Sequence, residues 1–273
     1  MDATQHSDLG FKLSVGVPLL VVAAGAWYLS VVAAQNSSAM AMGSSMSNLP
    51  IVSMSGLFGS PDAVGVTTFL VVWLVGMVAM MFPAMVPVIS LYTGLMTKKE
   101  ARPHVSRFVG STLFLTGYLS LYAILGLSLF AVVYVAFQAG SMLPWLSSLS
   151  LAGVSAVLFA AGIWQLTPLK ERSLSKCISP LGFFLTHAKQ GLSGAFRMGA
   201  EHGAYCVACC WLYMLVMLAV AAMSVISMVF LSVIIIVEKA FVGSAAWFKW
   251  ISAGVFFLLG TLVVVFPSFL TLV

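Results

Sequence analysis

Residues 64–95 read VGVTTFLVVWLVGMVAMMFPAMVPVISLYTGL, and none of their side chains is charged. An apolar run of about 20 residues is long enough to cross the hydrocarbon core of a bilayer as a helix. The whole chain shares this character, because 62% of its 273 residues are hydrophobic and only 7% are charged. Soluble domains carry about 25% charged residues, so the composition excludes a soluble globular protein. It predicts an all-α, polytopic membrane protein.

Apolar runs of this kind recur along the chain and predict seven transmembrane helices. The fifth and sixth runs are almost continuous, and we divide them at 222–224 because one helix of that length would far exceed the bilayer thickness. The predicted spans are 11–34, 64–95, 107–138, 149–166, 203–222, 224–241 and 247–270. The remaining segments are too short for a soluble domain, so we expect one membrane domain, with an external loop at 35–63 and a cytoplasmic loop at 167–202.

The 12 basic residues predict the orientation of these spans. With seven spans, every Lys and Arg falls on one side of the membrane, and the loops on the other side carry only Asp62. Because basic residues gather on the cytoplasmic side, the N-terminus is predicted to be cytoplasmic and the C-terminus external. We therefore expect a multi-pass protein surrounded by the lipid of the cytoplasmic membrane. The net charge of +5 is then a topology signal, with no nucleic acid as partner.

Sulfur-bearing side chains dominate the interior of the second predicted span. Met77, Met81 and Met85 follow one another at intervals of four residues, so they form a stripe on one helix face. Met80 lies beside this stripe, and Pro83 removes a backbone hydrogen bond in the same turn. Thioethers and thiolates select Cu(I) over harder metal ions. The four methionines are either ligands for Cu(I) or flexible packing side chains.

A second sulfur stripe is predicted in the fifth span. Three of the four cysteines of the chain fall within five residues there, and two methionines follow at helical spacing: Cys206, Cys209, Cys210, Met214 and Met217. The predicted topology places the cysteines near the reducing cytoplasmic face, so we expect free thiols that hold a soft metal ion. Cys206 and Cys210 share one helix face and are expected to bind the ion together, which makes Cys209 the most dispensable. The alternative is that these cysteines are small hydrophobic residues in a packed helix.

Further candidate ligands lie on either side of the membrane interior. On the cytoplasmic side, Cys177 could fold back from its loop toward the other cysteines, and His202 lies one turn before Cys206. The external loop contains methionines that would capture Cu(I) where thiols would oxidise, namely Met40, Met42, Met46 and Met54. The order of methionine outside, methionine in the interior and cysteine inside favours inward movement of Cu(I).

Four specific motifs lie between residues 73 and 239. They are AMMxP at 79–83, QLTPLK at 165–170, CxxCCW at 206–211 and Glu-Lys at 238–239. These segments resemble a family of predicted metal-binding integral membrane proteins, which includes the membrane copper-delivery partner encoded beside a bacterial polyphenol oxidase. The resemblance implies copper handling. One departure is that the family usually carries two cysteines spaced CLxxC after Pro-Leu-Lys. This chain has Ser173 in place of the first, which argues against a two-thiol site within that loop alone.

Taken together, these patterns predict a copper-handling protein that binds Cu(I) through methionine and cysteine. It would deliver the ion across the membrane or to a membrane cuproenzyme. We expect no enzymatic activity, because the spans offer no residues for Ser-His-Asp or paired-carboxylate chemistry. Two alternatives stay open. One is an accessory subunit of a larger membrane complex, such as a copper-containing oxidase or monooxygenase. The other is a thiol oxidoreductase that uses Cys206 and Cys209.

Overall fold

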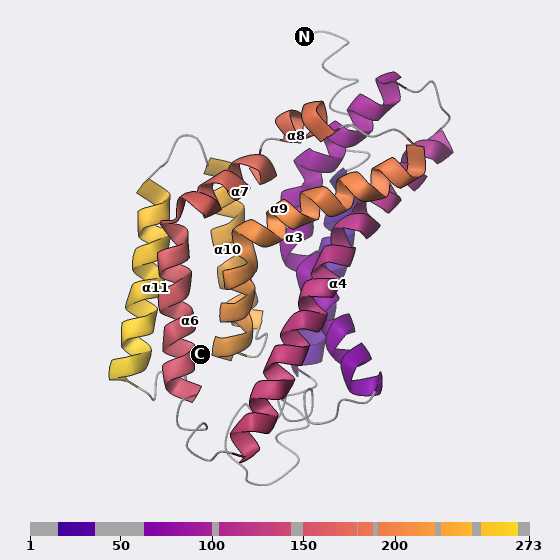
Figure 1. The fold of residues 1–273 in the computed structure, drawn as a ribbon. Coiled ribbons are helices and arrows are strands. Elements are labelled where there is room, and N and C mark those ends of the chain that lie inside the picture. The colour runs from indigo at the N-terminus through magenta and orange to yellow at the C-terminus, as the bar shows by residue number, and fades with distance from the viewer. Residues whose placement is uncertain are drawn as a thin grey trace.

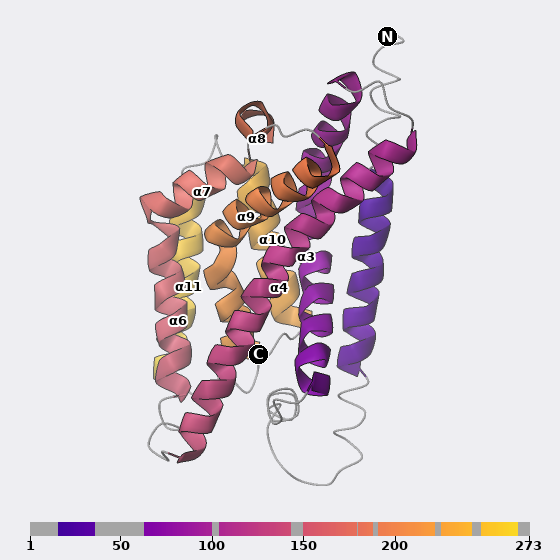
Figure 2. The same ribbon diagram turned by 45° about the vertical axis from the view of Figure 1, so that its right-hand side comes forward.

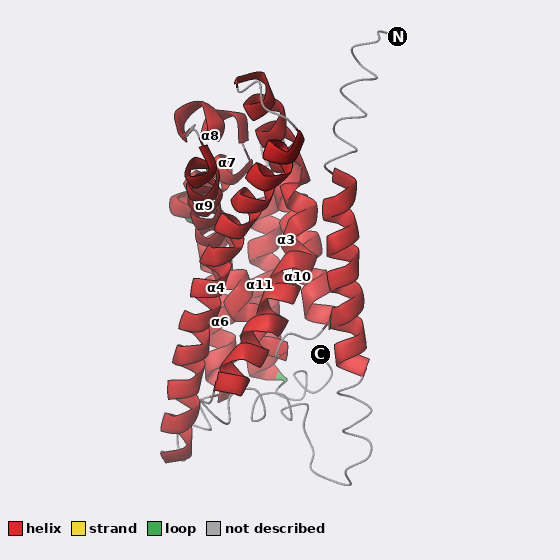
Figure 3. Cartoon of the chain, turned by 90° about the vertical axis from the view of Figure 1, so that its right-hand side faces the viewer, coloured by secondary structure: helices red, strands yellow, loops and turns green. Residues whose placement is uncertain are grey.

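The computed structural model describes residues 16–35, 63–99, 104–142, 150–178, 180–187, 191–221, 225–241 and 247–266. Within these ranges the chain is almost entirely α-helical and contains no strand, which confirms the all-α prediction (Figures 1 and 3). The helices are Gly16–Gln35, α3 (Ala63–Lys99), α4 (His104–Met142), α6 (Ser150–Gln165), α7 (Pro168–Ile178), α8 (Pro180–His187), α9 (Gly191–Ala221), α10 (Val225–Phe241) and α11 (Trp247–Val265).

Five of the described helices are long and apolar enough to cross a membrane, and α6 with α7 would make a sixth, broken span. Each segment predicted as a span contains a helix among the described residues, but these residues support five or six spans and not the exact count of seven. The difference lies in α6 and α10, which are short, with 16 and 17 residues. Helix α6 ends early because the chain bends by 69° before α7. Both chain termini lie outside the described residues.

The segment 167–202, which was predicted as a cytoplasmic loop, is mostly helical. It contains α7, α8 and the first turns of α9, which begins at Gly191 rather than near residue 203. The early turns of α9 are amphipathic. Ala195, Met198 and His202 are buried at helical spacing, whereas Arg197 and Glu201 form an ion pair of 3.4 Å on the outer face. A search for long apolar runs misses a helix of this mixed composition.

The helix Gly16–Gln35 lies beside α3 at the edge of the bundle (Figure 2). Its buried residues Leu19, Ala23 and Ala26 recur every three to four positions, so one face of the helix packs inward. On the opposite side of the bundle, α6 packs against α11 (Figure 1). There Phe159 and Phe257 contact each other, with a distance of 6.1 Å between ring centroids.

The backbones of α4 and α9 approach each other closely at Gly117, Gly199 and Gly203, and we call this contact the glycine seam. A β-carbon at Gly199 would overlap the carbonyl oxygen of Phe114, and one at Gly117 would overlap that of Phe196. Farther along, a β-carbon at Gly203 would lie 3.1 Å from the carbonyl oxygen of Tyr118. Small residues permit such close helix contacts. The seam places the tyrosines of α4 directly against the cysteine-bearing part of α9.

Candidate metal centre

The corner between α6 and α7 determines where Cys177 lies. The last turn of α6 tightens, because the backbone amides of Leu166 and Thr167 bond to carbonyls three residues back. The Thr167 hydroxyl then accepts a hydrogen bond of 3.3 Å from the amide of Lys170, and Pro168 takes the first position of α7. After this corner, α7 buries Lys170, Ser173, Leu174 and Cys177, which share one face. That face packs against α9.

A buried polar network fixes α7 to its neighbours. Lys170 Nζ donates to Glu238 Oε1 at 2.5 Å and to the Tyr213 hydroxyl at 2.9 Å. The Tyr213 hydroxyl donates to the other carboxylate oxygen of Glu238 at 3.1 Å. Gln165 accepts a hydrogen bond from Lys170 and donates one to Tyr213. The side chains of Lys170 and Glu238 are only 2% and 8% exposed, so these contacts compensate two desolvated charges. The four residues connect α6, α7, α9 and α10.

Two thiols and one imidazole converge between α7 and α9. Cys177 Sγ lies 2.6 Å from Cys206 Sγ, and His202 Nε2 lies 3.7 Å from Cys206 Sγ. The candidate ligand atoms of these three residues all lie within 4.8 Å of one another, and all three residues are buried. His202 and Cys206 share a face of α9 because they are one helical turn apart. The cluster therefore has the composition and closeness of a metal site.

The ring of His202 packs against three aromatic rings. The rings of Phe183, Phe114 and Tyr118 have centroids 5.3, 6.2 and 6.3 Å from that of His202. Its buried Nδ1 has no hydrogen-bond partner among the described residues, and its other nitrogen faces the sulfur of Cys206. An unpaired buried polar atom costs about 1–3 kcal/mol. A soft metal ion at the sulfur pair would bond to Nε2, the nitrogen that faces Cys206, so the donor set fits a metal.

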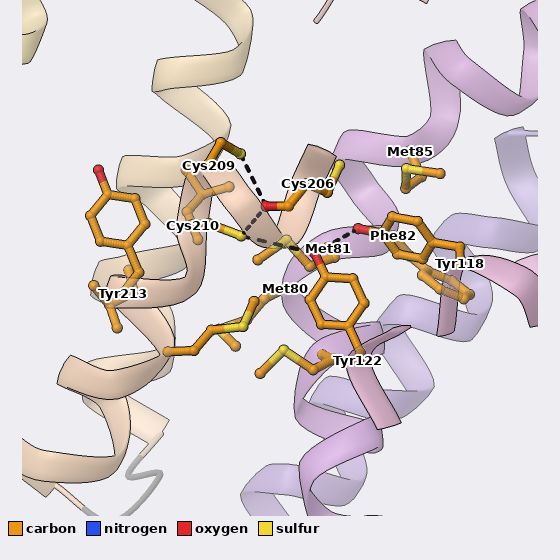
Figure 4. Packing of buried hydrophobic residues seen from close by; sticks show 14 of the residues in the cluster. Met80, Met81, Phe82, Met85, Tyr118, Tyr122, Cys206, Cys209, Cys210 and Tyr213 are labelled. Atoms are coloured by element: carbon orange, nitrogen blue, oxygen red, sulfur yellow. Dashed lines mark hydrogen bonds between the residues drawn. The ribbon is translucent and has the colours of Figure 1, made fainter. Parts of the chain in front are cut away.

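Cys209 and Cys210 lie farther along α9 (Figure 4), and the side chain of Cys209 also interacts with Cys177. Both thiols donate to the carbonyl oxygen of Cys206, at 3.1 and 2.7 Å. Cys210 Sγ also lies 3.9 Å from the hydroxyl of Tyr122, which accepts a hydrogen bond of 3.1 Å from Tyr118. The sulfur of Cys206, by contrast, contacts Cys177 of α7. The joint binding of an ion by Cys206 and Cys210 stays a prediction.

The methionines predicted as ligands are core residues. Each is at most 2% exposed: Met77, Met80, Met81, Met85, Met214 and Met217. Figure 4 shows the side chains of Met80 and Met81 reaching from α3 toward the α9 segment that carries Cys209 and Cys210. Their role as ligands stays a prediction, because burial alone is equally expected of packing side chains. The external methionines Met40, Met42, Met46 and Met54 lie outside the described residues.

Charged residues complete the surroundings of the sulfur pair. Lys239 of α10 brings Nζ to 3.8 Å from Cys206 Sγ. Glu238 and Lys239 were singled out in the sequence only as a motif, and their contacts with Lys170 and Cys206 were not predicted. Sequence reasoning noted Cys177 and His202 without assigning them to the site. The sequence offered one signal for the contact between Lys170 and Glu238, because each residue lies in a motif segment, 165–170 or 238–239.

Comparison with known proteins adds one finding. The family model described as PpoB2, a copper chaperone, matches residues 70–263. None of the curated proteins and none of the solved structures compared with the chain matches it. The matched region runs from α3 into α11 and contains Cys177, His202 and Cys206 together with the buried polar network. Because this match covers well over half of the sequence, the chain belongs to the PpoB2 copper chaperone family.

Proposed function

We propose that this protein binds Cu(I) at Cys177, His202 and Cys206 and passes the ion on, either across the membrane or to a membrane cuproenzyme. The observation that carries the proposal is the convergence of two thiols and an imidazole from two helices in a buried position. Sulfur ligands select Cu(I) over harder ions, and membership of a copper chaperone family supports copper as the cargo. The role is binding and delivery rather than catalysis.

The buried methionines would form a second, weaker set of ligands. Met80 and Met81 reach toward the cysteine-bearing segment of α9, and Met214 and Met217 continue the sulfur positions along that helix. Thioethers bind Cu(I) as uncharged ligands, whereas thiolates bring negative charge and hold it more tightly. A copper ion would therefore move from methionine toward the thiols of the centre.

The test is a Cu(I) titration of the purified, reduced protein in competition with a chelator of known affinity. We expect one Cu(I) to be held per centre, and we expect bound Cu(I) to protect Cys177 and Cys206 from alkylation. Alkylation that is indifferent to Cu(I) would contradict the proposal. The same assay without prior reduction separates a second candidate, a thiol–disulfide function, which the 2.6 Å approach of the two sulfur atoms favours. Thiols that react only after reduction would support that candidate.

We further propose that the chain lies in the cytoplasmic membrane with the seven-span topology, and that the metal centre is near the cytoplasmic face. Large apolar side chains point outward on several helices, as lipid contact requires, including Val21, Val132 and Leu258. The Lys249–Glu171 ion pair brings the start of α11 to α7, so basic residues of both helices share one end of the bundle.

Reporter fusions test this orientation. A reporter placed after Val273 is expected to be external, and one placed in the segment 93–106 is expected to be cytoplasmic, because the positive charges accumulate on the side of that segment. Enzymatic reporters that are active on only one side of the membrane give the readout. If both fusions report the same side, the seven-span topology is wrong.

A further inference from the structure

Lys239 is the cationic side chain in contact with the sulfur pair. Its Nζ lies 3.8 Å from Cys206 Sγ, and α10 carries it to the side of the cluster. The neighbouring carboxylate does not neutralise this ammonium. Glu238 is occupied by Lys170 at 2.5 Å and by the hydroxyl of Tyr213 at 3.1 Å. The positive charge of Lys239 is therefore directed at a ligand sulfur rather than at an acid.

The ligands alone do not determine which metal binds. Two cysteines and a histidine suit Cu(I), but thiolate and imidazole are also common ligands of Zn(II). A centre that handles one of these ions needs another feature that discriminates between them. The total charge of the occupied site is such a feature, because the walls around His202 are the aromatic rings of Phe114, Tyr118 and Phe183. Uncompensated charge is costly in such surroundings.

We infer that Lys239 makes the centre selective for a monovalent soft cation over a divalent one. The inference rests on the proposed function. Thiols bind a metal as thiolates, and histidine binds as the neutral imidazole. Two thiolates carry two negative charges, and the ammonium of Lys239 supplies one positive charge. A monovalent ion then brings the buried site to zero net charge, whereas a divalent ion leaves one positive charge in excess.

Substitution at Lys239 tests the inference with metal ions as probes. Affinities for Cu(I), Ag(I), Zn(II) and Cd(II) are measured by competition for the wild type, Lys239→Gln and Lys239→Arg. Lys239→Gln should weaken Cu(I) and Ag(I) binding by on the order of tenfold to a hundredfold, because the occupied site is then left with one uncompensated negative charge. It should leave Zn(II) and Cd(II) binding unchanged or tighter. Lys239→Arg, which keeps the charge, should behave like the wild type.

Lys176→Gln is the matched control, because Lys176 precedes Cys177 but is exposed and contacts Tyr205 instead of a ligand sulfur. It should leave all four affinities unchanged. An equal loss of monovalent and divalent binding in Lys239→Gln would show a structural role and overturn the inference. Binding of Cd(II) as tightly as Ag(I) by the wild type would also overturn it, without reliance on any variant.

The outcomes separate this inference from the proposed function. If Lys239→Gln leaves the ratio of Ag(I) to Cd(II) affinity unchanged while Cys206→Ser abolishes Cu(I) binding, the centre is real and Lys239 does not set its selectivity. If Cys206→Ser retains the Cu(I) affinity of the wild type, the proposed site itself is wrong. Thermal unfolding of each metal-free variant shows that the protein is folded before metals are added.

Discussion

Replacing Cys177 or Cys206 with serine is expected to lower the Cu(I) affinity of the protein by about a hundredfold or more. Loss of an outer-shell partner already costs about 10- to 100-fold in metal affinity, and here a direct ligand is lost. The serine hydroxyl is a hard ligand and replaces a thiolate poorly for Cu(I). Competition titration against a Cu(I) chelator measures the change.

Serine variants at Cys209 and Cys210 complete this test. The thiol of Cys209 donates to the carbonyl oxygen of Cys206 at 3.1 Å, and a serine hydroxyl at this position makes the same bond. Cys209→Ser should therefore keep the wild-type affinity. Cys210→Ser distinguishes two hypotheses. If Cys206 and Cys210 bind the ion together, this variant should lose Cu(I) affinity. If the ion is bound by the Cys177–Cys206 centre, the variant should keep it. Unchanged affinity in Cys177→Ser would rule out the centre described here.

The second large effect is expected at Lys170. Lys170→Met leaves Glu238 buried without its cation, and removing one partner of a buried ion pair costs about 3–5 kcal/mol of unfolding free energy. Thermal unfolding of the purified protein gives the measurement. The double variant Lys170→Met with Glu238→Gln should recover much of the loss, because no unpaired charge then remains.

An ion pair at the rim of the bundle is the control for this prediction. Lys249 pairs with Glu171, and their side chains are 33% and 54% exposed. Lys249→Gln should change the unfolding free energy by about 0–1 kcal/mol, because water screens exposed pairs. If Lys170→Met and Lys249→Gln unfold alike, the Lys170–Glu238 pair does not hold α7 in place.

The sequence predicted the helical segments well because apolar length is a local property. Every run assigned as a span contains a helix, and the bounds fit closely for α10, which was predicted at 224–241 and is found at Val225–Phe241. Predictions failed where polar residues interrupt the apolar pattern. Helix α9 continues through Arg197 and Glu201, and the polar α7 follows a corner at Thr167, so hydropathy reads both as loop.

The candidate centre was predicted only in part, because it depends on which helix faces meet. Cys206 was predicted from the spacing of cysteines within one helix, which needs no tertiary information. Its contact with Cys177 requires both the 69° bend after α6 and the register of the buried face of α7. Likewise, Lys170 and Glu238 are separated in the sequence by α8, the whole of α9 and most of α10, and nothing local identifies them as partners.

The glycine seam between α4 and α9 has a consequence for how a buried centre exchanges its ion. One wall has to move, and the wall formed by α4 and α9 has no free space, because Gly117 and Gly199 already touch the opposing backbone. On the other side, α7 has 11 residues and follows a sharp bend. We expect the pair α4–α9 to stay fixed, and the movement to come from the end of α7 that carries Cys177, which lies beyond the anchored Lys170.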